Sequence, residues 1–296
     1  MPLRGVGTPG CPGTRPWRRR EKRPSSWRGA VLASPLVRSL PKETPMSDDA
    51  VLTERRGRVM IITLNRPDAM NSINGALSAG LVAAIAELDG DDSLTAGVLT
   101  GNGRGFCAGM DLKAFAAGED IGPMMQFIRH GSEKPLIGAV EGFALAGGLE
   151  LALTCDLLVA AENASFGIPE VKVGLFAAGG GLQRLPGRVG FAKAMEMALT
   201  AEAIKADEAL QSGLVSRVAP KGSAVDVAIE LAEAIAKNAP LGVKASKKLI
   251  WTAVDASEED FYAIQAPLQQ SVFSSNDAKE GPAAFAQKRA PEWSGS

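Results

Sequence analysis

The chain has 296 residues, and its 32 basic and 33 acidic side chains leave a net charge of −1. This balance hides two parts of opposite sign, because residues 1–45 hold ten bases and two acids while residues 46–296 hold 22 bases and 31 acids. The 46% of apolar residues argues against global disorder. No apolar run reaches the roughly 18–20 residues of a membrane span. Three cysteines exclude a disulfide framework, and a single histidine excludes most histidine-rich zinc sites.

The basic segment, residues 1–45, carries eight of the 18 prolines and the run Trp17-Arg18-Arg19-Arg20, without any periodic apolar pattern. We expect a disordered extension outside the fold. Three interpretations stay open: an inert or non-native extension, a mitochondrial-type presequence, and an interaction segment. The prolines argue against the amphipathic helix that a presequence needs. The composition changes at Met46-Ser47-Asp48-Asp49, which resembles a natural start.

From residue 51 onward, short apolar strands alternate with helical patterns. Val51–Glu54 and Arg58–Leu64 flank Arg56-Gly57 and predict a hairpin, and the apolar spacing within Gly75–Leu88 predicts a helix. The next expected elements are a strand at Thr95–Thr100, a helix that begins at Asp111–Ala116, a strand at Pro135–Val140, a helix at Gly147–Thr154 and a strand at Leu157–Ala161. After about Gly222 only helical patterns remain, at Ala224–Ala236, Val243–Val254, Glu258–Gln270 and Asp277–Arg289. This order predicts an α/β core, 46–221, followed by a helical region, 222–296.

A glycine-rich segment, Gly101–Asp111, follows the strand expected at Thr95–Thr100. A dinucleotide loop that starts at Gly101 would need glycine at Phe106, and the Gly-Lys of a phosphate loop is absent. Two interpretations remain. The glycines form a tight turn, or the N–H groups of Gly109–Asp111 point at an oxygen that carries or develops negative charge.

Two further segments, Ala144–Glu150 and Phe166–Glu170, place an acid just after a turn. Paired glycines before Glu150 let the backbone approach a ligand closely, and Pro169 fits the first position of a helix. Each acid taken alone is explained by the helix dipole, which favours acids in a first turn. Two amide-rich turns combined with two acids favour an active site.

These segments resemble the motifs of the crotonase (enoyl-CoA hydratase/isomerase) superfamily. The resemblance rests on Cys107–Lys113, Glu141–Glu150 and Phe166–Glu170, with further matches at Leu64–Asn71 and Gly179–Leu185. It extends over about Val51–Arg289, so residues 1–45 lie outside it. The resemblance implies a spiral of ββα units (the ClpP/crotonase-like fold), a C-terminal helical trimerisation region, and a thioester substrate carried on coenzyme A. It implies no metal and no separate cofactor, because coenzyme A arrives as part of the substrate.

The resemblance also implies the site residues. The oxyanion hole consists of the N–H groups of Met110 and Gly147, and the catalytic acids are Glu150 and Glu170. The residues expected to contact the substrate or its coenzyme A are Ala69, Asn71, Ala108, Asp111, Leu112, Lys113, Phe143, Ala146 and Pro169. Ala146 replaces a glycine that many short-chain hydratases have. Leu175–Ala178 also departs from the family pattern, and both departures lie near the expected acyl pocket.

Two carboxyl groups suit the addition of water to a 2,3-double bond, since one activates water for C3 and the other delivers a proton to C2. We expect Glu150 to act mainly on water and Glu170 mainly at C2, although the pair titrates as a unit. Retention of both acids favours a hydratase over an enoyl-CoA isomerase, and a carnitinyl-CoA-type dehydratase stays open. An RNA-binding protein on the same scaffold, or a silent scaffold, is disfavoured by the acidic body and by the complete motifs.

The remaining expectations concern assembly, location and single residues. The protein is expected to form a homotrimer or a dimer of trimers in the cytoplasm, or in the mitochondrial matrix if residues 1–45 are a presequence. Cys107 and Cys155 are expected in the core, and His130 at the surface near a helix end. Lys113 and Arg66 could face the phosphates of coenzyme A. The stripe Met124, Met125, Phe127 and Ile128 could border the acyl pocket or form core.

Overall fold

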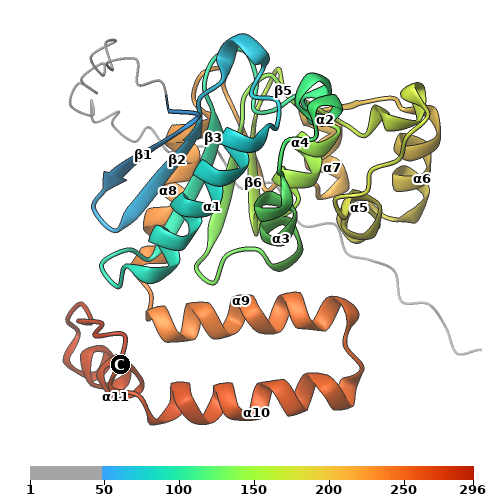
Figure 1. Ribbon diagram of the computed structural model, residues 1–296. Helices are drawn as coiled ribbons and strands as arrows, with labels where there is room; N and C mark the ends of the chain where they lie inside the picture. The colour runs from blue at the N-terminus through green and yellow to red at the C-terminus, as the bar shows by residue number, and fades with distance from the viewer. Residues whose placement is uncertain (1–48) are drawn as a thin grey trace, which may run out of the picture. The chain divides into compact units, whose positions relative to one another are not determined.

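The computed structural model describes residues 49–296, so the expectations for residues 1–45 lie outside the described part of the chain. The described residues begin with the hairpin that the sequence predicts: β1, Val51–Arg56, pairs antiparallel with β2, Val59–Leu64. The turn contains Gly57, whose φ of +57° suits the tight reversal. Figure 1 shows the hairpin at one edge of the main sheet.

The main sheet has six strands in the order β1-β2-β3-β4-β6-β9. From β2 onward all neighbours are parallel. The later strands are β3, Ala96–Gly101; β4, Leu136–Val140; β6, Leu157–Ala161; and β9, Arg217–Ala219. Parallel neighbours need crossover connections, and the chain supplies them as the alternating helices that the sequence predicts.

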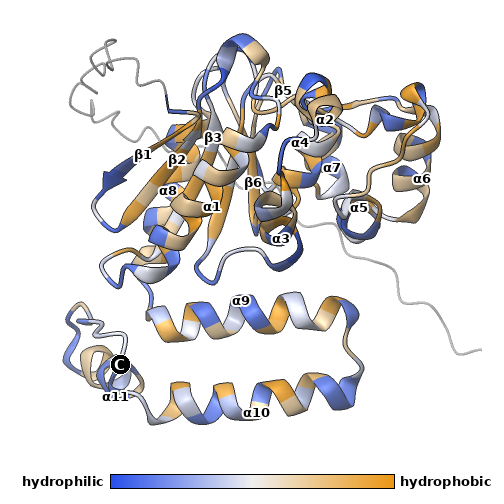
Figure 2. Ribbon diagram, viewed as in Figure 1, coloured by the Kyte–Doolittle hydropathy of each residue, from blue (hydrophilic) through white to orange (hydrophobic). Residues whose placement is uncertain are grey.

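The side chains of the strands alternate between two cores, one on each face of the sheet. In β2, Met60 and Ile62 enter the larger core, while Val59 and Ile61 enter the smaller one. The smaller core is closed by α8, Ala224–Ala236, through its buried alanines and Ile229. The larger core includes side chains of α1, Gly75–Gly90. Figure 2 shows the sheet as the most apolar part of the fold, as expected for strands buried on both faces.

A second, three-stranded sheet, β5-β7-β8, extends the core beyond the carboxyl ends of β4 and β6. Its strands are β5, Phe143–Leu145; β7, Ser165–Gly167; and β8, Ile204–Lys205. Successive pairs of strands, β4 then β5 and β6 then β7, turn from one sheet into the other, which is the ββα spiral that the resemblance implies. This arrangement brings the ends of β5 and β7 together, and both acidic motifs follow there.

Short helices connect the strands around these ends. They are η1, Pro67–Ala69; α2, Leu112–Ala117; α3, Gly122–His130; α4, Gly147–Ala152; η2, Pro169–Val173; α5, Gly181–Val189; α6, Phe191–Thr200; and α7, Ala206–Ser212. In α3, Met124, Phe127 and Ile128 are buried in the larger core and Met125 packs against it, so this stripe is core.

The last part of the chain is helical, as predicted from residue 222 onward. After α8 come α9, Pro240–Asp255; α10, Glu258–Ser274; and α11, Asn276–Gln287. Neither α9 nor α10 contains a buried residue within this single chain. Large apolar side chains stand exposed on them, including Ile250, Val254 and Phe273. Figure 1 shows α9 and α10 as an antiparallel pair beside the core.

Candidate active site

The two amide-rich turns lie side by side because the backbone of β5 pairs with the glycine-rich loop. Leu145 donates to Cys107, and Phe106 donates to Phe143. Ile73 then donates to Gly109, and Asp111 donates back to Ile73. This ladder leaves the N–H of Met110 without a hydrogen-bond acceptor among residues 49–296.

Gly147 brings the second free N–H, because it is the first residue of α4 and has no acceptor within the helix. A methyl group on Gly147 would lie 3.7 Å from the Met110 nitrogen, so the two amides are neighbours. Gly109 has a φ of +103°, and a methyl group there would lie 2.7 Å from Cβ of Ala146. Only glycine fits this contact, which explains the glycine between Ala108 and Met110.

Ala146 has a φ of +52° and ψ of −131°, a conformation that favours glycine. Its N–H donates to Gly167 at 2.9 Å, and its carbonyl accepts from Leu149 and Glu150. The alanine that departs from the family's glycine therefore sits at a strained junction between β7 and α4.

Glu150 is the more enclosed of the two acids, with a residue exposure of only 5%. Its Oε1 accepts from the Gly181 N–H at 2.9 Å, and Gly179 donates a second backbone hydrogen bond. Burial raises the pKa of Glu150, while these hydrogen bonds and the positive charge of Arg184 oppose the rise. The residue predicted to be a catalytic acid is thus buried. An acid that only complemented the helix dipole would be expected at the surface.

Glu170 lies in η2 and is half-buried. Among residues 49–296, its Oε2 is the buried side-chain oxygen without a hydrogen-bond partner. Burial raises the pKa of Glu170, its own N–H opposes the rise, and the charge of Glu150 raises the pKa further. Glu170 thus feels the charge of Glu150 and presents an oxygen that the protein leaves unsatisfied.

Asp111 caps α2, because its Oδ1 accepts from the N–H groups of Lys113 and Ala114. Its Oδ2 lies 3.0 Å from Nη2 of Arg66, and Arg66 also donates to the Ser72 carbonyl. The Arg66 contact, with the two N–H groups, holds the pKa of Asp111 below its ordinary value. Arg66 is thus engaged in orienting the Met110 loop and is not a free cation for phosphates.

Asn71, one of the residues expected to contact the substrate, is engaged in hydrogen bonds inside the protein. Its side chain is fully buried, accepts from the Arg66 N–H, and donates to the carbonyls of Asn102 and Gly105. The Asn71 carbonyl accepts from the Cys107 thiol. With every polar group used inside the protein, Asn71 supports the glycine-rich loop from behind.

The other residues expected to contact the substrate lie at or near the surface of this region. Leu112 and Lys113 are exposed at the start of α2, and the partly buried ones are Ala69, Ala108, Phe143, Ala146 and Pro169. Lys113 is thereby available to an anionic ligand. Exposed apolar side chains continue from both motifs: Leu112 and Phe115 after Met110, and Val173, Leu175 and Phe176 after Glu170.

Several alternatives are settled by burial. Cys107 and Cys155 are buried, and burial raises the pKa of each thiol to about 12, which confirms them as core residues. His130 is exposed at the end of α3, where its Nδ1 contacts the Gln126 carbonyl. Residues 49–296 contain no cluster of three potential metal ligands and no helix long and apolar enough to cross a membrane.

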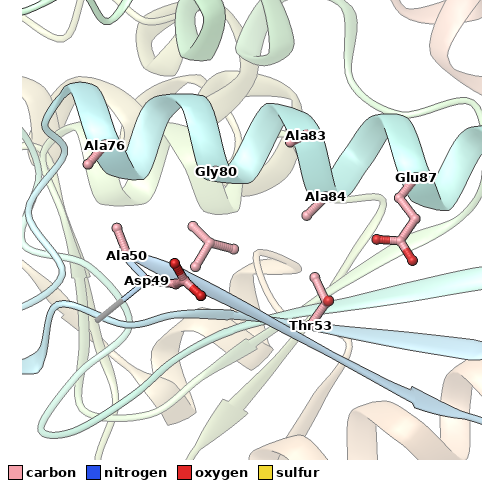
Figure 3. Close-up of a pocket in the computed structure, with 9 residues that line it drawn as sticks. Asp49, Ala50, Thr53, Ala76, Gly80, Ala83, Ala84 and Glu87 are labelled. Atoms are coloured by element: carbon pink, nitrogen blue, oxygen red, sulfur yellow. The ribbon is translucent and has the colours of Figure 1, made fainter. Parts of the chain in front are cut away.

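A cavity of about 470 Å³ lies between β1 and α1, away from both acids. Figure 3 shows the small residues of α1 facing Ala50 and Thr53 across it. Since no motif residue lines it, this cavity does not belong to the candidate site.

Gly179, Gly181 and Arg184 lie in a segment whose sequence alone indicates no role for them. Methyl groups on Gly179 and Gly181 would lie 2.7 Å from Oε2 and 3.0 Å from Cγ of Glu150, so both glycines make room for that side chain. The glycine run within Gly179–Leu185, which matches the family pattern, was the feature of the sequence that could have indicated a role. Its meaning depends on contacts between α4 and α5, which the sequence does not show.

Comparisons with known proteins identify the family and the fold of the chain. The model of the enoyl-CoA hydratase/isomerase family matches residues 54–296. The 2,3-dehydroadipyl-CoA hydratase of Escherichia coli strain K12 is 39% identical over 251 residues, which cover 83% of this chain and 98% of that protein. The carnitinyl-CoA dehydratase of Proteus mirabilis strain HI4320 is 40% identical over 264 residues, which cover 84% of this chain and 100% of that protein.

A solved enoyl-CoA hydratase of Mycobacterium tuberculosis H37Rv superposes with a TM-score of 0.81 at 51% identity, covering 84% of this chain and 100% of that one. The fold and the motif order therefore agree over nearly the whole described chain. The chain belongs to the enoyl-CoA hydratase/isomerase family.

Proposed function

We propose that the protein is an enoyl-CoA hydratase that adds water across the 2,3-double bond of a 2-enoyl-CoA thioester, or removes it in reverse. The observation that carries this proposal is the pair of carboxyls of buried Glu150 and half-buried Glu170. One of them is held by backbone amides, and the other keeps an oxygen without a partner. Relatives named as hydratases support the same reaction.

In the proposed mechanism the thioester carbonyl accepts hydrogen bonds from Met110 and Gly147. Attack at C3 converts this carbonyl into an enolate, and the two fixed amides stabilise its charge without rearranging. The loss of one such donor typically raises a barrier by about 3–4 kcal/mol. Both donors are backbone groups, so the identity of the Met110 side chain does not matter for this role.

Glu150, ionised, takes a proton from water as the water oxygen bonds to C3. Glu170, protonated, gives its proton to C2 as the enolate collapses, so the elements of water are added. The raised pKa of Glu170 suits the proton donor, because burial and the neighbouring charge of Glu150 both favour its neutral form. The amide hydrogen bonds and Arg184 oppose the rise for Glu150, which suits the base.

The proposal includes the acyl-CoA substrate and self-association. The exposed apolar side chains near both motifs suit an acyl chain, and exposed Lys113 suits the phosphates of coenzyme A. No further cofactor or metal takes part in the steps above. The unburied apolar side chains of α9 and α10 support assembly as a homotrimer or a dimer of trimers, because burial in an interface would remove them from water.

The test compares the full chain with Glu150→Gln and Glu170→Gln, following the loss of the conjugated enoyl-thioester absorbance. Each variant should lower kcat by about 10²–10⁴-fold, the usual contribution of a positioned acid or base. Glu162→Gln, a change at an exposed acid after β6, should leave kcat unchanged. Wild-type turnover by both active-site variants would show the mechanism to be wrong.

Two related reactions remain as arms of the same experiment. An isomerase would move the double bond through Glu170 alone, so Glu150→Gln would largely retain double-bond migration. A carnitinyl-CoA-type dehydratase uses the same pair of acids, and the relative of that name makes it a specific alternative. A panel of acyl groups that includes carnitinyl-CoA, assayed with the wild-type chain, distinguishes this dehydratase from a simple hydratase.

A further inference from the structure

The tryptophan of α9, Trp251, connects the C-terminal helices to α5, whose first residue donates a hydrogen bond to Glu150. The guanidinium carbons of Arg184 and Arg188 lie 5.8 Å and 5.7 Å from the centre of its indole ring. Its Nε1 donates to Oδ1 of Asp156 at 2.7 Å. Lys247, one turn earlier on α9, lies 2.8 Å from Oδ2 of the same carboxylate. Trp251 is therefore anchored, and both arginines are on its faces within cation–π range.

The two arginines stand on successive turns of α5, where their like charges repel. Arg188 donates to the carbonyls of Cys155 and Asp156, and Arg184 donates to the carbonyls of Ile128 and Arg129 at the end of α3. Hydrogen bonds to backbone carbonyls thus fix the position of each guanidinium. The electron-rich faces of the indole lower the free-energy cost of holding the two cations close together.

Helix α5 determines the surroundings of Glu150. Its first residue, Gly181, donates the 2.9 Å hydrogen bond to Oε1 of Glu150, and the charge of Arg184 acts on the same carboxylate. A displacement of Arg184 would change the field at Glu150 even though Arg184 makes no hydrogen bond to it. Trp251 therefore acts on Glu150 through Arg184.

We infer that Trp251 is a positioning residue for the reaction: by holding Arg184 through a cation–π contact, it couples the C-terminal helix α9 to the ionisation of Glu150. The inference rests on the proposed function for its kinetic consequence, while the contacts themselves do not. It identifies a path by which α9, a helix without a fully buried residue in the single chain, can affect the active site.

Other charged groups also act on Glu150 and Arg184. Glu170 couples to Glu150 from η2, and Asp255 of α9 and Arg188 both act on Arg184. Among residues 49–296, Arg184 is the one cation whose charge acts on Glu150, and it lowers the pKa of that carboxyl. When Arg184 loses its place, the pKa of Glu150 rises. The acidic limb of the pH profile of kcat/KM, below which the base is protonated, then moves to higher pH.

The experiment compares Trp251→Phe with Trp251→Leu in the full chain, since both fill a similar space but only phenylalanine keeps an aromatic face. Trp251→Leu should shift the acidic limb to higher pH and lower kcat by about 2- to 30-fold, the range of one cation–π contact, with KM little changed. Trp251→Phe should stay close to wild type. Ser246→Ala, at an exposed polar position on α9, serves as the control and should leave the limb in place.

A double variant isolates the route. Once Arg184→Gln has removed the charge, adding Trp251→Leu should cause no further shift. Equal shifts in the phenylalanine and leucine variants, or a full further shift in the double variant, would overturn the inference. Light scattering on every variant checks that assembly is unchanged.

An infrared titration separates the inference from the proposed function. In protein labelled with ¹³C-glutamate, the carboxylate band lost in Glu150→Gln should titrate at higher pH in Trp251→Leu than in wild type. This readout needs no turnover. If the wild-type chain hydrates no enoyl-CoA, the proposed function fails and the infrared shift still decides the inference.

Discussion

The two acids occupy contrasting surroundings, although both follow a short strand of the second sheet. Glu150 lies between α4 and α5, accepts backbone hydrogen bonds from two glycines and faces the charge of Arg184. Glu170 lies in η2 with one oxygen unpartnered and with the negative charge of Glu150 nearby. Burial raises the pKa of both carboxyls, but hydrogen bonds and a positive charge oppose the rise at Glu150, while the charge of Glu150 adds to it at Glu170. The surroundings of each carboxyl, and not its residue type, therefore determine which one acts as base and which as acid.

The largest expected effect comes from filling the space beside Glu150. In Gly179→Ala the new methyl group would lie 2.7 Å from Oε2 of Glu150, and the alternative to a clash is a displaced carboxylate. We expect kcat to fall by about 10²-fold or more, because a misplacement of about 1 Å is enough for such a loss. Steady-state kinetics with an enoyl-CoA substrate measures it.

Gly187→Ala is the matched control, since Gly187 lies in α5 with nothing within 4 Å of the added methyl group. This change should leave kcat unaltered and raise stability by about 0.5–1 kcal/mol, through the better helix propensity of alanine. Equal activity of Gly179→Ala and Gly187→Ala would show that the glycine run does not position Glu150.

A smaller effect should appear in the pH dependence of stability, and it concerns Glu170. Its pKa is raised in the folded protein, so its contribution to stability is present below the unfolded value near 4.5 and is lost as the pH rises through the folded pKa. Glu170→Gln cannot ionise and avoids this loss. The melting temperature of the variant should therefore exceed that of wild type at pH 8, and the difference should shrink toward pH 4.

Thermal melts at several pH values, with Glu230→Gln as an exposed control on α8, check this sign. A variant that is less stable than wild type at pH 8 would mean that the Glu170 carboxylate is satisfied in the free protein. It would then no longer differ from Glu150 in the proposed way.

The sequence predicted the elements of the main sheet because β2, β3, β4 and β6 are apolar runs bounded by turns, a local pattern. It also predicted the two acids and the two amides, through motifs that lie within single turns. The strands β5 and β7 are three residues long and depend on pairing with each other and with other segments, so no local pattern reveals them.

The contacts that hold the site residues in place could not be predicted from local sequence patterns either. Gly181 meets Glu150 across 31 positions of the chain, and Arg184 meets Trp251 across 67, so both contacts depend on how helices pack. Asn71 shows the opposite case. The family resemblance selected it as a substrate contact, while its burial and hydrogen bonds show that it supports the glycine-rich loop.

The smallest expected effect tests the strained junction between the two regions, Ala146, which bonds to Gly167 before Glu170 and to the N–H of Glu150. Ala146→Gly relieves the positive φ, whose cost is about 1 kcal/mol or more, but adds the entropy cost of glycine, about 0.5–1 kcal/mol. The net change in unfolding free energy should be stabilising and below about 1 kcal/mol. Ala144→Gly, in β5, serves as the comparison and should destabilise, because it removes a fully buried methyl group and gains no relief of strain. If urea denaturation finds the two variants equally destabilised, the conformation of Ala146 is not strained, and its alanine would then require an explanation from the acyl pocket.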